Sequence, residues 1–156
     1  MNMNMSISMK RWLAPVLLAL VCQTPVTAFA ASKDEALAMV KKAVAYLKQN
    51  GPEKSLAEFN KTEGQFVSGE LYVVVLDMNG VLLADGNKPK LVGKALIDVK
   101  DVNGKAFVRE ELEIARSKGA GWVDFVWFNP TTKAMAPRSS YFEKVGELIV
   151  LTGVYN

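Results

Sequence analysis

Apolar positions recur every three or four residues between Ser32 and Asn50, which predicts an amphipathic helix. The apolar positions are Ala36, Leu37, Val40, Ala43, Val44 and Leu47. Ser32 and Glu35 have the spacing of a capping box at the start of this helix. Gly51-Pro52 ends it and starts a short second helix over Glu53 to Phe59.

The pattern then changes to two apolar runs around a turn. Leu71 to Leu76 is followed by Asp77-Met78-Asn79-Gly80 and then by Val81 to Ala84, which predicts a β-hairpin. The acidic turn resembles a calcium loop superficially. An EF-hand loop needs oxygen ligands at alternating positions, and Met78 and Val81 break that arrangement, so we interpret the segment as a turn.

Helical spacing returns between Asn103 and Gly119, where it predicts a second long helix with Gly119 as its C′ residue. Glu110, Glu111 and Glu113 lie on this helix. Neighbouring positions on a helix diverge by about 100°, whereas a paired carboxylate site needs two groups that converge. We therefore interpret these three glutamates as solvated.

The last 36 residues contain three runs rich in aromatic and β-branched residues. They predict strands over Trp122 to Phe128, Ala134 to Lys144 and Leu148 to Tyr155, joined through Asn129-Pro130 and Gly146. Together with the two strands of the predicted hairpin, these three give five strands. The order of elements predicts an α+β fold in which one five-stranded antiparallel sheet carries the helices.

The first 30 residues have the features of a cleaved export signal. Lys10 and Arg11 precede the apolar run Trp12 to Val21, and Ala28-Phe29-Ala30 supplies small residues at a cleavage site. The run is shorter than the roughly 20 apolar residues of a membrane-spanning helix, which disfavours a retained anchor. Bulky Val21 disfavours the other alternative, lipidation of Cys22. We expect residues 1–30 to be removed and residues 31–156 to form one periplasmic domain.

The amino-acid composition excludes several kinds of catalytic and metal site. The sequence has no histidine, and its single cysteine lies in the predicted leader. Histidine-based triads, histidine-ligated zinc and covalent haem therefore each lack a required residue, so we expect no enzyme, no cofactor and no metal. The net charge of +3 includes two leader cations, and the remaining lysines are scattered among acids. Nucleic acid is not an expected partner.

Arg138 interrupts the middle strand of the last three. Alternation places it on the same strand face as Ser140. On the preceding strand, Asp124 lies on the face opposite to Val123, Phe125 and Trp127. Which faces meet depends on a register that the sequence does not specify. A salt bridge from Arg138 to Asp124 or Glu143, or a snorkelling position at the surface, therefore stays open beside a role in ligand binding.

Several sequence blocks occur in the order of a known family. They are Leu71 to Ala84 with Tyr72, Asp77 and Gly80, then Leu91-Val92-Gly93-Lys94, Gly121-Trp122-Val123-Asp124-Phe125-x-Trp127, Arg138-Ser139-Ser140-Tyr141 and Gly153-Val154-Tyr155. Together they resemble a single Cache domain of the second type over nearly all of the predicted mature chain. The resemblance implies a PAS-like sheet, with a long N-terminal helix across one face and a small-ligand pocket against the other.

The resemblance also implies which residues contact a ligand. Phe125 and Trp127 would form the pocket wall, with ordinary core packing as their alternative. Tyr72 and Tyr141 would donate phenolic hydrogen bonds, again with packing as the alternative. Arg138 and Ser140 would hold an anionic group.

Two positions depart from the family pattern. Relatives often carry lysine where Arg138 stands, and a guanidinium offers a planar fork that suits a carboxylate or phosphate better. Many relatives resemble Ala-His-Pro after the second strand, whereas here Ala84 is followed by Asp85 and Gly86. Whether this loop contacts a ligand stays open.

Family members usually form the extracytoplasmic sensing part of chemotaxis receptors and sensor kinases, between two transmembrane helices. The sequence ends at Asn156 without a second such helix, so the resemblance implies a freestanding secreted form. We expect a periplasmic module that binds a small organic anion, in or alongside chemotaxis or two-component signalling. A membrane chemoreceptor or sensor kinase is the expected partner, and a homodimer is also considered. The alternative is a ligand-free interaction protein that docks on a membrane sensor.

Overall fold

The computed structural model describes residues 31–129 and 131–156, so the predicted leader and Pro130 of the predicted turn lie outside the described residues. The helices are α1 (Lys33–Asn50), α2 (Pro52–Phe59), the 3-10 turn η1 (Pro89–Leu91) and α3 (Phe107–Lys118). The strands are β1 (Val67–Ser68), β2 (Leu71–Tyr72), β3 (Val74–Asp77), β4 (Leu82–Asp85), β5 (Ala120–Asn129), β6 (Ala134–Val145) and β7 (Leu148–Tyr155).

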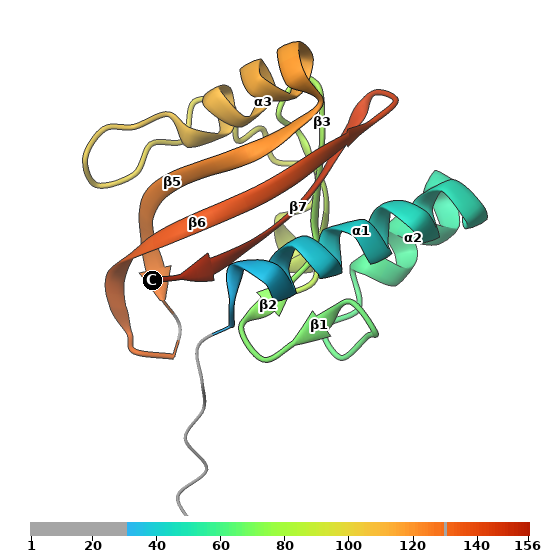
Figure 1. Cartoon of the computed structure of the whole chain (residues 1–156), viewed down its shortest axis with the longest axis horizontal. Helices are drawn as coiled ribbons and strands as arrows, with labels where there is room; N and C mark the ends of the chain where they lie inside the picture. The colour runs from blue at the N-terminus through green and yellow to red at the C-terminus, as the bar shows by residue number, and fades with distance from the viewer. Residues whose placement is uncertain (1–30, 130) are drawn as a thin grey trace, which may run out of the picture.

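One five-stranded sheet organises the fold, in the order β4-β3-β7-β6-β5. Every neighbouring pair is antiparallel. Helix α1 contacts β6 and β7 on one side, whereas α3 contacts β5 and β6. In Figure 1, α3 lies above the ribbon of β5 and β6 and α1 lies below it. The predicted α+β fold, with five antiparallel strands and a long N-terminal helix, is confirmed.

Helix α1 begins at the predicted capping box. The backbone amide of Ser32 donates to Glu35 Oε2 over 2.7 Å, and the amide of Glu35 donates to Ser32 Oγ over 3.2 Å. These bonds satisfy two amides that have no partner inside the helix. The buried side of α1 consists of Ala36, Val40, Ala43, Val44 and Leu47. This side covers the sheet, as the apolar spacing predicts.

The run Leu71 to Leu76 is not one strand, which corrects the prediction. It divides into β2 and β3 because the two parts have different partners. Leu71 and Tyr72 pair with β1 in a small two-stranded sheet. From Val74 onward the chain pairs with β4 and β7 in the main sheet. The turn after β3 is the predicted one, with Asp77 Oδ1 accepting from the amides of Asn79 and Val81 over 2.8 and 2.9 Å.

Helix α3 ends at Gly119, whose φ of 81° is the left-handed conformation expected of a C′ glycine. A loop ahead of α3 is tied to the sheet edge by Asp101. Its Oδ2 accepts from the amide of Val126 over 3.0 Å, and its Oδ1 accepts from the amides of Asn103 and Lys105 over 2.9 Å. These bonds lower the pKa of Asp101, the bond from Val126 most of all.

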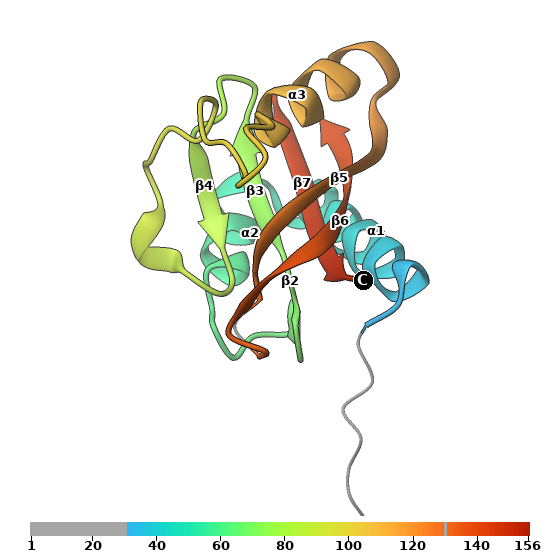
Figure 2. The same cartoon turned by 90° about the vertical axis from the view of Figure 1, so that its left-hand side faces the viewer.

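Apolar side chains are buried on both faces of the sheet. One cluster lies under α1 and α2 and contains Phe59, Phe66 and Tyr141. The other lies under α3 and contains Phe107, Leu112 and Phe142. The segment between β4 and α3 loops out beyond the β4 edge (Figure 2). Within residues 31–129 and 131–156, no helix has the length and apolarity needed to cross a membrane.

Candidate functional site

A cavity of about 290 Å³ lies between α3 and the sheet. Its wall comes from every main-sheet strand, from α3, from β2 and from the segment between β4 and α3. Most of the wall is apolar. The lining residues are Tyr72, Val74, Leu76, Leu82, Asp85, Lys88, Leu91, Leu96, Val99, Phe107, Val108, Glu111, Phe125, Trp127, Arg138, Ser140 and Leu151.

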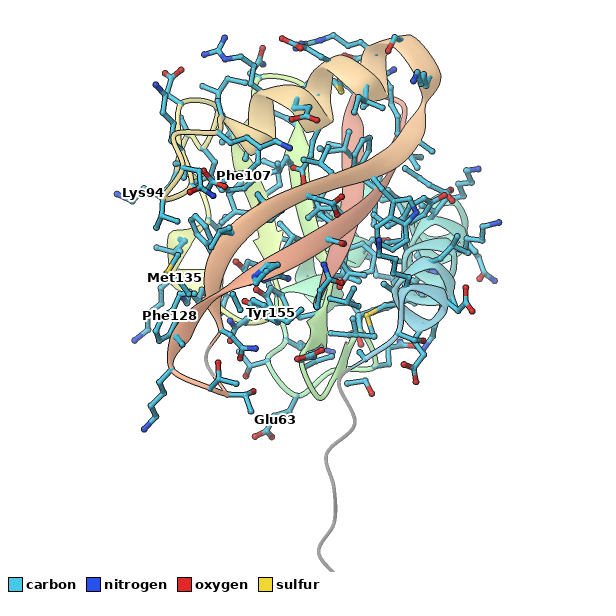
Figure 3. All side chains as sticks on the ribbon, turned by 60° about the vertical axis from the view of Figure 1, so that its left-hand side comes forward. Glu63, Lys94, Phe107, Phe128, Met135 and Tyr155 are labelled. Atoms are coloured by element: carbon cyan, nitrogen blue, oxygen red, sulfur yellow. The ribbon has the colours of Figure 1, made fainter. Side chains whose placement is uncertain are left out.

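Three aromatic rings form one side of this cavity. The Phe107 ring stacks on Phe125, with centroids 4.1 Å apart and an angle of 6° between the planes. Trp127 meets Phe107 edge-on at 5.2 Å. Figure 3 shows Phe107 on the same side of β5 as α3. Phe125 and Trp127 both line the cavity.

Arg138 reaches the cavity from β6 and is only 5% exposed. Its Nη1 donates to the hydroxyl oxygens of Tyr72 and Tyr155 over 2.9 and 3.0 Å. The guanidinium carbon also lies 5.1 Å and 4.9 Å from the centroids of those two rings. The Tyr155 hydroxyl in turn donates a hydrogen bond to the carbonyl oxygen of Phe128 over 2.7 Å. The two phenols fix the guanidinium without neutralising it.

The alternative in which Arg138 forms a salt bridge with Asp124 or Glu143 is wrong. Phe125, not Asp124, is directly opposite Arg138 on the neighbouring strand. Since successive side chains alternate between faces, Asp124 and Glu143 point to the other side of the sheet. There they accept hydrogen bonds from Ser139 and Tyr141. Across the described residues, the ion pairs are Lys61–Glu58, Lys105–Glu110 and Arg109–Asp98, none of which involves Arg138.

Alternation also corrects the prediction for Tyr141, which does not line the cavity. It belongs to the cluster under α1, with its ring 5.1 Å from that of Trp122. Its hydroxyl donates to Glu143 Oε1 over 2.8 Å. Burial, with a smaller effect from Glu143, raises the pKa of Tyr141 to about 12. The Arg-Ser-Ser-Tyr block thus divides between two faces, with Arg138 and Ser140 in the cavity.

Glu111 is the residue that the sequence analysis misses. It is 2% exposed and lines the cavity, so its assignment to solvent is wrong, whereas Glu113 is exposed. Glu111 immediately precedes Leu112, and both are buried where α3 packs on the sheet. Its helical position between Val108 and Ala115, which are apolar and lie three or four residues away, is the signal that could have identified it.

Burial raises the pKa of Glu111 to about 7. Ser140 and Arg138 lower it in part, Glu110 raises it, and Lys105 lowers it slightly. The carboxyl therefore holds its proton in the folded protein at pH values where an exposed glutamate is ionised.

This shift makes folding stability depend on pH. The unfolded chain releases the proton near pH 4.5 and the folded chain near 7, so the folded state binds more protons between these values. The free energy of unfolding should then fall as pH rises through this window, by roughly 3 kcal/mol relative to Glu111→Gln. Denaturant unfolding between pH 4 and 8 measures the difference. Glu113→Gln, on the exposed side of α3, is the control and should leave the wild-type profile unchanged.

The loop after β4 contributes two charged groups to the cavity, Asp85 and Lys88. Asp85 Oδ1 accepts from the amides of Asn87 and Lys88, both over 2.8 Å. The Asp85 carboxylate thus holds the loop in place while lining the cavity.

Gly153 determines how closely the Arg138 side chain can lie on β7. A Cβ at position 153 would stand 2.5 Å from Arg138 Nε and 3.2 Å from its Cζ. It would also be 3.1 Å from the carbonyl oxygen of Ser139. A side chain at this position therefore forces the guanidinium to move.

Gly153→Ala should weaken binding of an anion at Arg138 by about tenfold or more, because a charge-assisted hydrogen bond is misplaced. Overpacking should also destabilise the fold by about 1–3 kcal/mol. Calorimetric titration and denaturant unfolding measure the two effects. Gly153→Ala should reduce the free energy of unfolding less in an Arg138→Ala background than in the wild type, because the guanidinium atoms that the new Cβ would meet are absent. An equal cost in both backgrounds would mean that Gly153 does not position Arg138.

Comparisons with known proteins place this geometry in a family. The sequence profile described as Single Cache domain 2 matches residues 21–156. A methyl-accepting chemotaxis protein from Vibrio parahaemolyticus RIMD 2210633 is 31% identical with a TM-score of 0.66, over 79% of this chain and 87% of that one. A structure described as the basis for carboxylic acid recognition by a Cache chemosensory domain is 25% identical with a TM-score of 0.65, over 78% and 91%.

The fold alone is shared with the periplasmic sensor domain of a chemotaxis protein. That domain is 22% identical with a TM-score of 0.61, over 78% of this chain and 88% of that one. The chain thus spans most of each of these solved sensor domains.

Proposed function

The chain belongs to the single Cache domain 2 family, a family of extracytoplasmic sensing modules, and from this premise we propose that it binds a small carboxylate through Arg138. Tyr72, Phe125, Trp127, Arg138 and Ser140 form the proposed site. In this proposal the aromatic rings supply apolar contact, and the guanidinium holds the carboxylate group.

One observation carries the proposal: a buried cation faces the cavity without an acid within ion-pair distance among the described residues. A buried charge is costly unless it is paired and hydrogen-bonded. The two phenols satisfy part of the guanidinium as hydrogen-bond acceptors, but neither is a carboxylate. A carboxylate would supply the missing countercharge and accept a charge-assisted hydrogen bond.

The size and lining of the cavity agree with a small ligand. Its volume of about 290 Å³ lies just below the usual range for ligand pockets, roughly 300–1,000 Å³, which favours a small ligand. The apolar wall suits a short hydrocarbon portion attached to the charged group. Carboxylic acid recognition by the similar Cache chemosensory domain supports the same class of ligand for this chain.

A thermal-shift series tests the proposal with matched pairs of a carboxylate and its uncharged amide, such as propionate and propionamide. A ligand at about 100 times its dissociation constant adds roughly 2.7 kcal/mol to stability, which should raise the midpoint by several degrees. Only the carboxylates should produce the shift. If acids, amino acids and polyamines all leave the midpoint unchanged, the ligand-free interaction protein is the better description.

We propose further that residues 1–30 are an export signal removed before Ala31, so that the module acts in the periplasm. A membrane chemoreceptor or sensor kinase would then receive its signal, and a homodimer is one form in which it could do so. The intact mass of the exported protein tests the leader. Retained Met1, or a diacylglycerol on Cys22, would contradict it.

A further inference from the structure

Three polar side chains from two elements meet in the lining of the cavity. Arg138 and Ser140 lie two residues apart on one face of β6, and Glu111 comes from α3. They are 5%, 1% and 2% exposed. We call them the polar cluster of the cavity. The proposed function uses the cation of this cluster and leaves the carboxyl of Glu111 without a role.

The hydroxyl of Ser140 has no hydrogen-bond partner among the described residues, although the side chain is buried. Leaving a buried hydroxyl unsatisfied costs about 1–3 kcal/mol. Such a group needs an explanation, and a bound molecule with polar atoms is one. Ser140 also lies close enough to the Glu111 carboxyl to lower its pKa, so the hydroxyl can donate to Glu111 or to a molecule bound at the polar cluster.

The charged and titratable groups around Glu111 do not pair with it. Arg138 on β6 is not within ion-pair distance of Glu111, and Lys105 ahead of α3 is paired with Glu110 at 3.0 Å. Tyr72 on β2 and the rim residues Asp85 and Lys88 are the remaining such groups that line the cavity. The lining residues of β3, β5 and β7 are apolar. Burial therefore has a larger effect than any single neighbouring charge on the protonation state of the Glu111 carboxyl.

We propose that Glu111, as a neutral carboxyl, is a specificity-determining residue that donates its proton in a hydrogen bond to the anion held by Arg138, so that the module binds the anion and a proton together. The inference rests on the proposed carboxylate function. In this arrangement Arg138 carries the only formal charge of the polar cluster, and one monoanion neutralises it. Ser140 donates to the same anion or to the second oxygen of the Glu111 carboxyl.

Electrostatics gives the physical reason for the coupling. An ionised Glu111 would place a second negative charge beside the bound carboxylate inside a medium of low dielectric constant. Like charges that share a site raise the pKa of one of them, so ligand binding should strengthen proton binding by Glu111. Linkage then requires that the proton strengthen ligand binding by the same factor.

An amino acid is the competing occupant. Its ammonium group would donate to an ionised Glu111 while Arg138 held its carboxylate, so binding would favour higher pH. Burial of Glu111 without a paired cation favours the neutral carboxyl, and hence the monocarboxylate. The two occupants make opposite predictions for the effect of pH.

Calorimetric titration with propionate between pH 6 and 9 distinguishes them, since propionate stays ionised throughout. Repeating each titration in two buffers of different ionisation enthalpy counts the protons taken up. For the wild type, affinity should fall by up to about tenfold per pH unit above pH about 7, with an uptake that approaches one proton. Glu111→Gln, which keeps a hydrogen-bond donor, should bind propionate with little pH dependence and no proton uptake. Glu113→Gln is the matched control and should behave as the wild type.

Three results would overturn the inference. The first is a wild-type affinity that does not change with pH, and the second is the same slope in Glu111→Gln as in the wild type. The third is β-alanine, the ammonium analogue of propionate, binding more tightly than propionate as pH rises. If propionate does not bind at any pH, the proposed carboxylate function is contradicted as well. If it binds without the expected pH dependence, only the role of Glu111 is contradicted.

Discussion

Replacing Arg138 by alanine is expected to weaken carboxylate binding by about 2 kcal/mol or more, roughly 30-fold in the dissociation constant. The guanidinium is the cation of the polar cluster, and Tyr72 and Tyr155 already hold it in place. The ligand therefore meets a group that loses little freedom on binding. Arg138→Lys should recover only part of the affinity, because an ammonium cannot reproduce the planar fork.

Stability should change less than affinity in Arg138→Ala. The substitution removes the hydrogen bonds to two phenols, which destabilises the fold, and it also removes a desolvated charge, which stabilises it. Titration calorimetry and unfolding midpoints on the same samples separate the two effects. Arg109→Ala is the control, since Arg109 lies on α3, pairs with Asp98 and does not line the cavity. Unchanged affinity in Arg138→Ala would mean that the site lies elsewhere.

Val44→Asp is expected to have the largest effect on folding, a loss of several kcal/mol. Val44 is 6% exposed and packs with Val40 and Leu47 in the cluster under α1. The substitution removes apolar contact and buries a carboxyl without a partner. Chemical denaturation measures the loss.

The adjacent residue supplies the control for Val44→Asp. Ala45 is exposed on the same helix, so Ala45→Asp introduces the same side chain at almost the same place in the sequence. It should cost well under 1 kcal/mol, close to the difference in helix propensity. Similar losses from both substitutions would contradict the packing of α1 on the sheet through Val44. Ligand affinity of the folded protein should be unaffected in either case, since Val44 is not part of the cavity.

Local features of this protein are predictable from sequence because neighbouring residues alone determine them. The capping box of Ser32 and Glu35 joins groups three residues apart, and Gly119 ends α3 through its own backbone conformation. The Asp77 turn is closed by bonds that span two and four residues. The apolar spacing of α1 likewise predicts the side that becomes buried. The α+β class follows from the order of such elements.

Contacts between segments that are far apart in the sequence could not be predicted without the tertiary structure. The break between β2 and β3 depends on β1 and β7, which lie elsewhere in the chain. A register that places Phe125 opposite Arg138 puts Asp124 on the other face, and a shift by one residue would have reversed that outcome. The same alternation separates Tyr141 from Arg138 and Ser140.

The cavity shows the same division between sequence and structure. The family resemblance nominated Arg138, Phe125 and Trp127, and alternation along β5, which is a local property, places the two aromatic residues on one face of that strand. Glu111 enters the cavity only because α3 packs across the sheet and carries that carboxyl toward Ser140 and Arg138, residues about 30 positions away in the chain. Local sequence patterns predict the long helices, the last three strands and the side of α1 that is buried. Tertiary packing decided which polar groups are buried together, because desolvation depends on what covers a side chain and not on its neighbours in sequence.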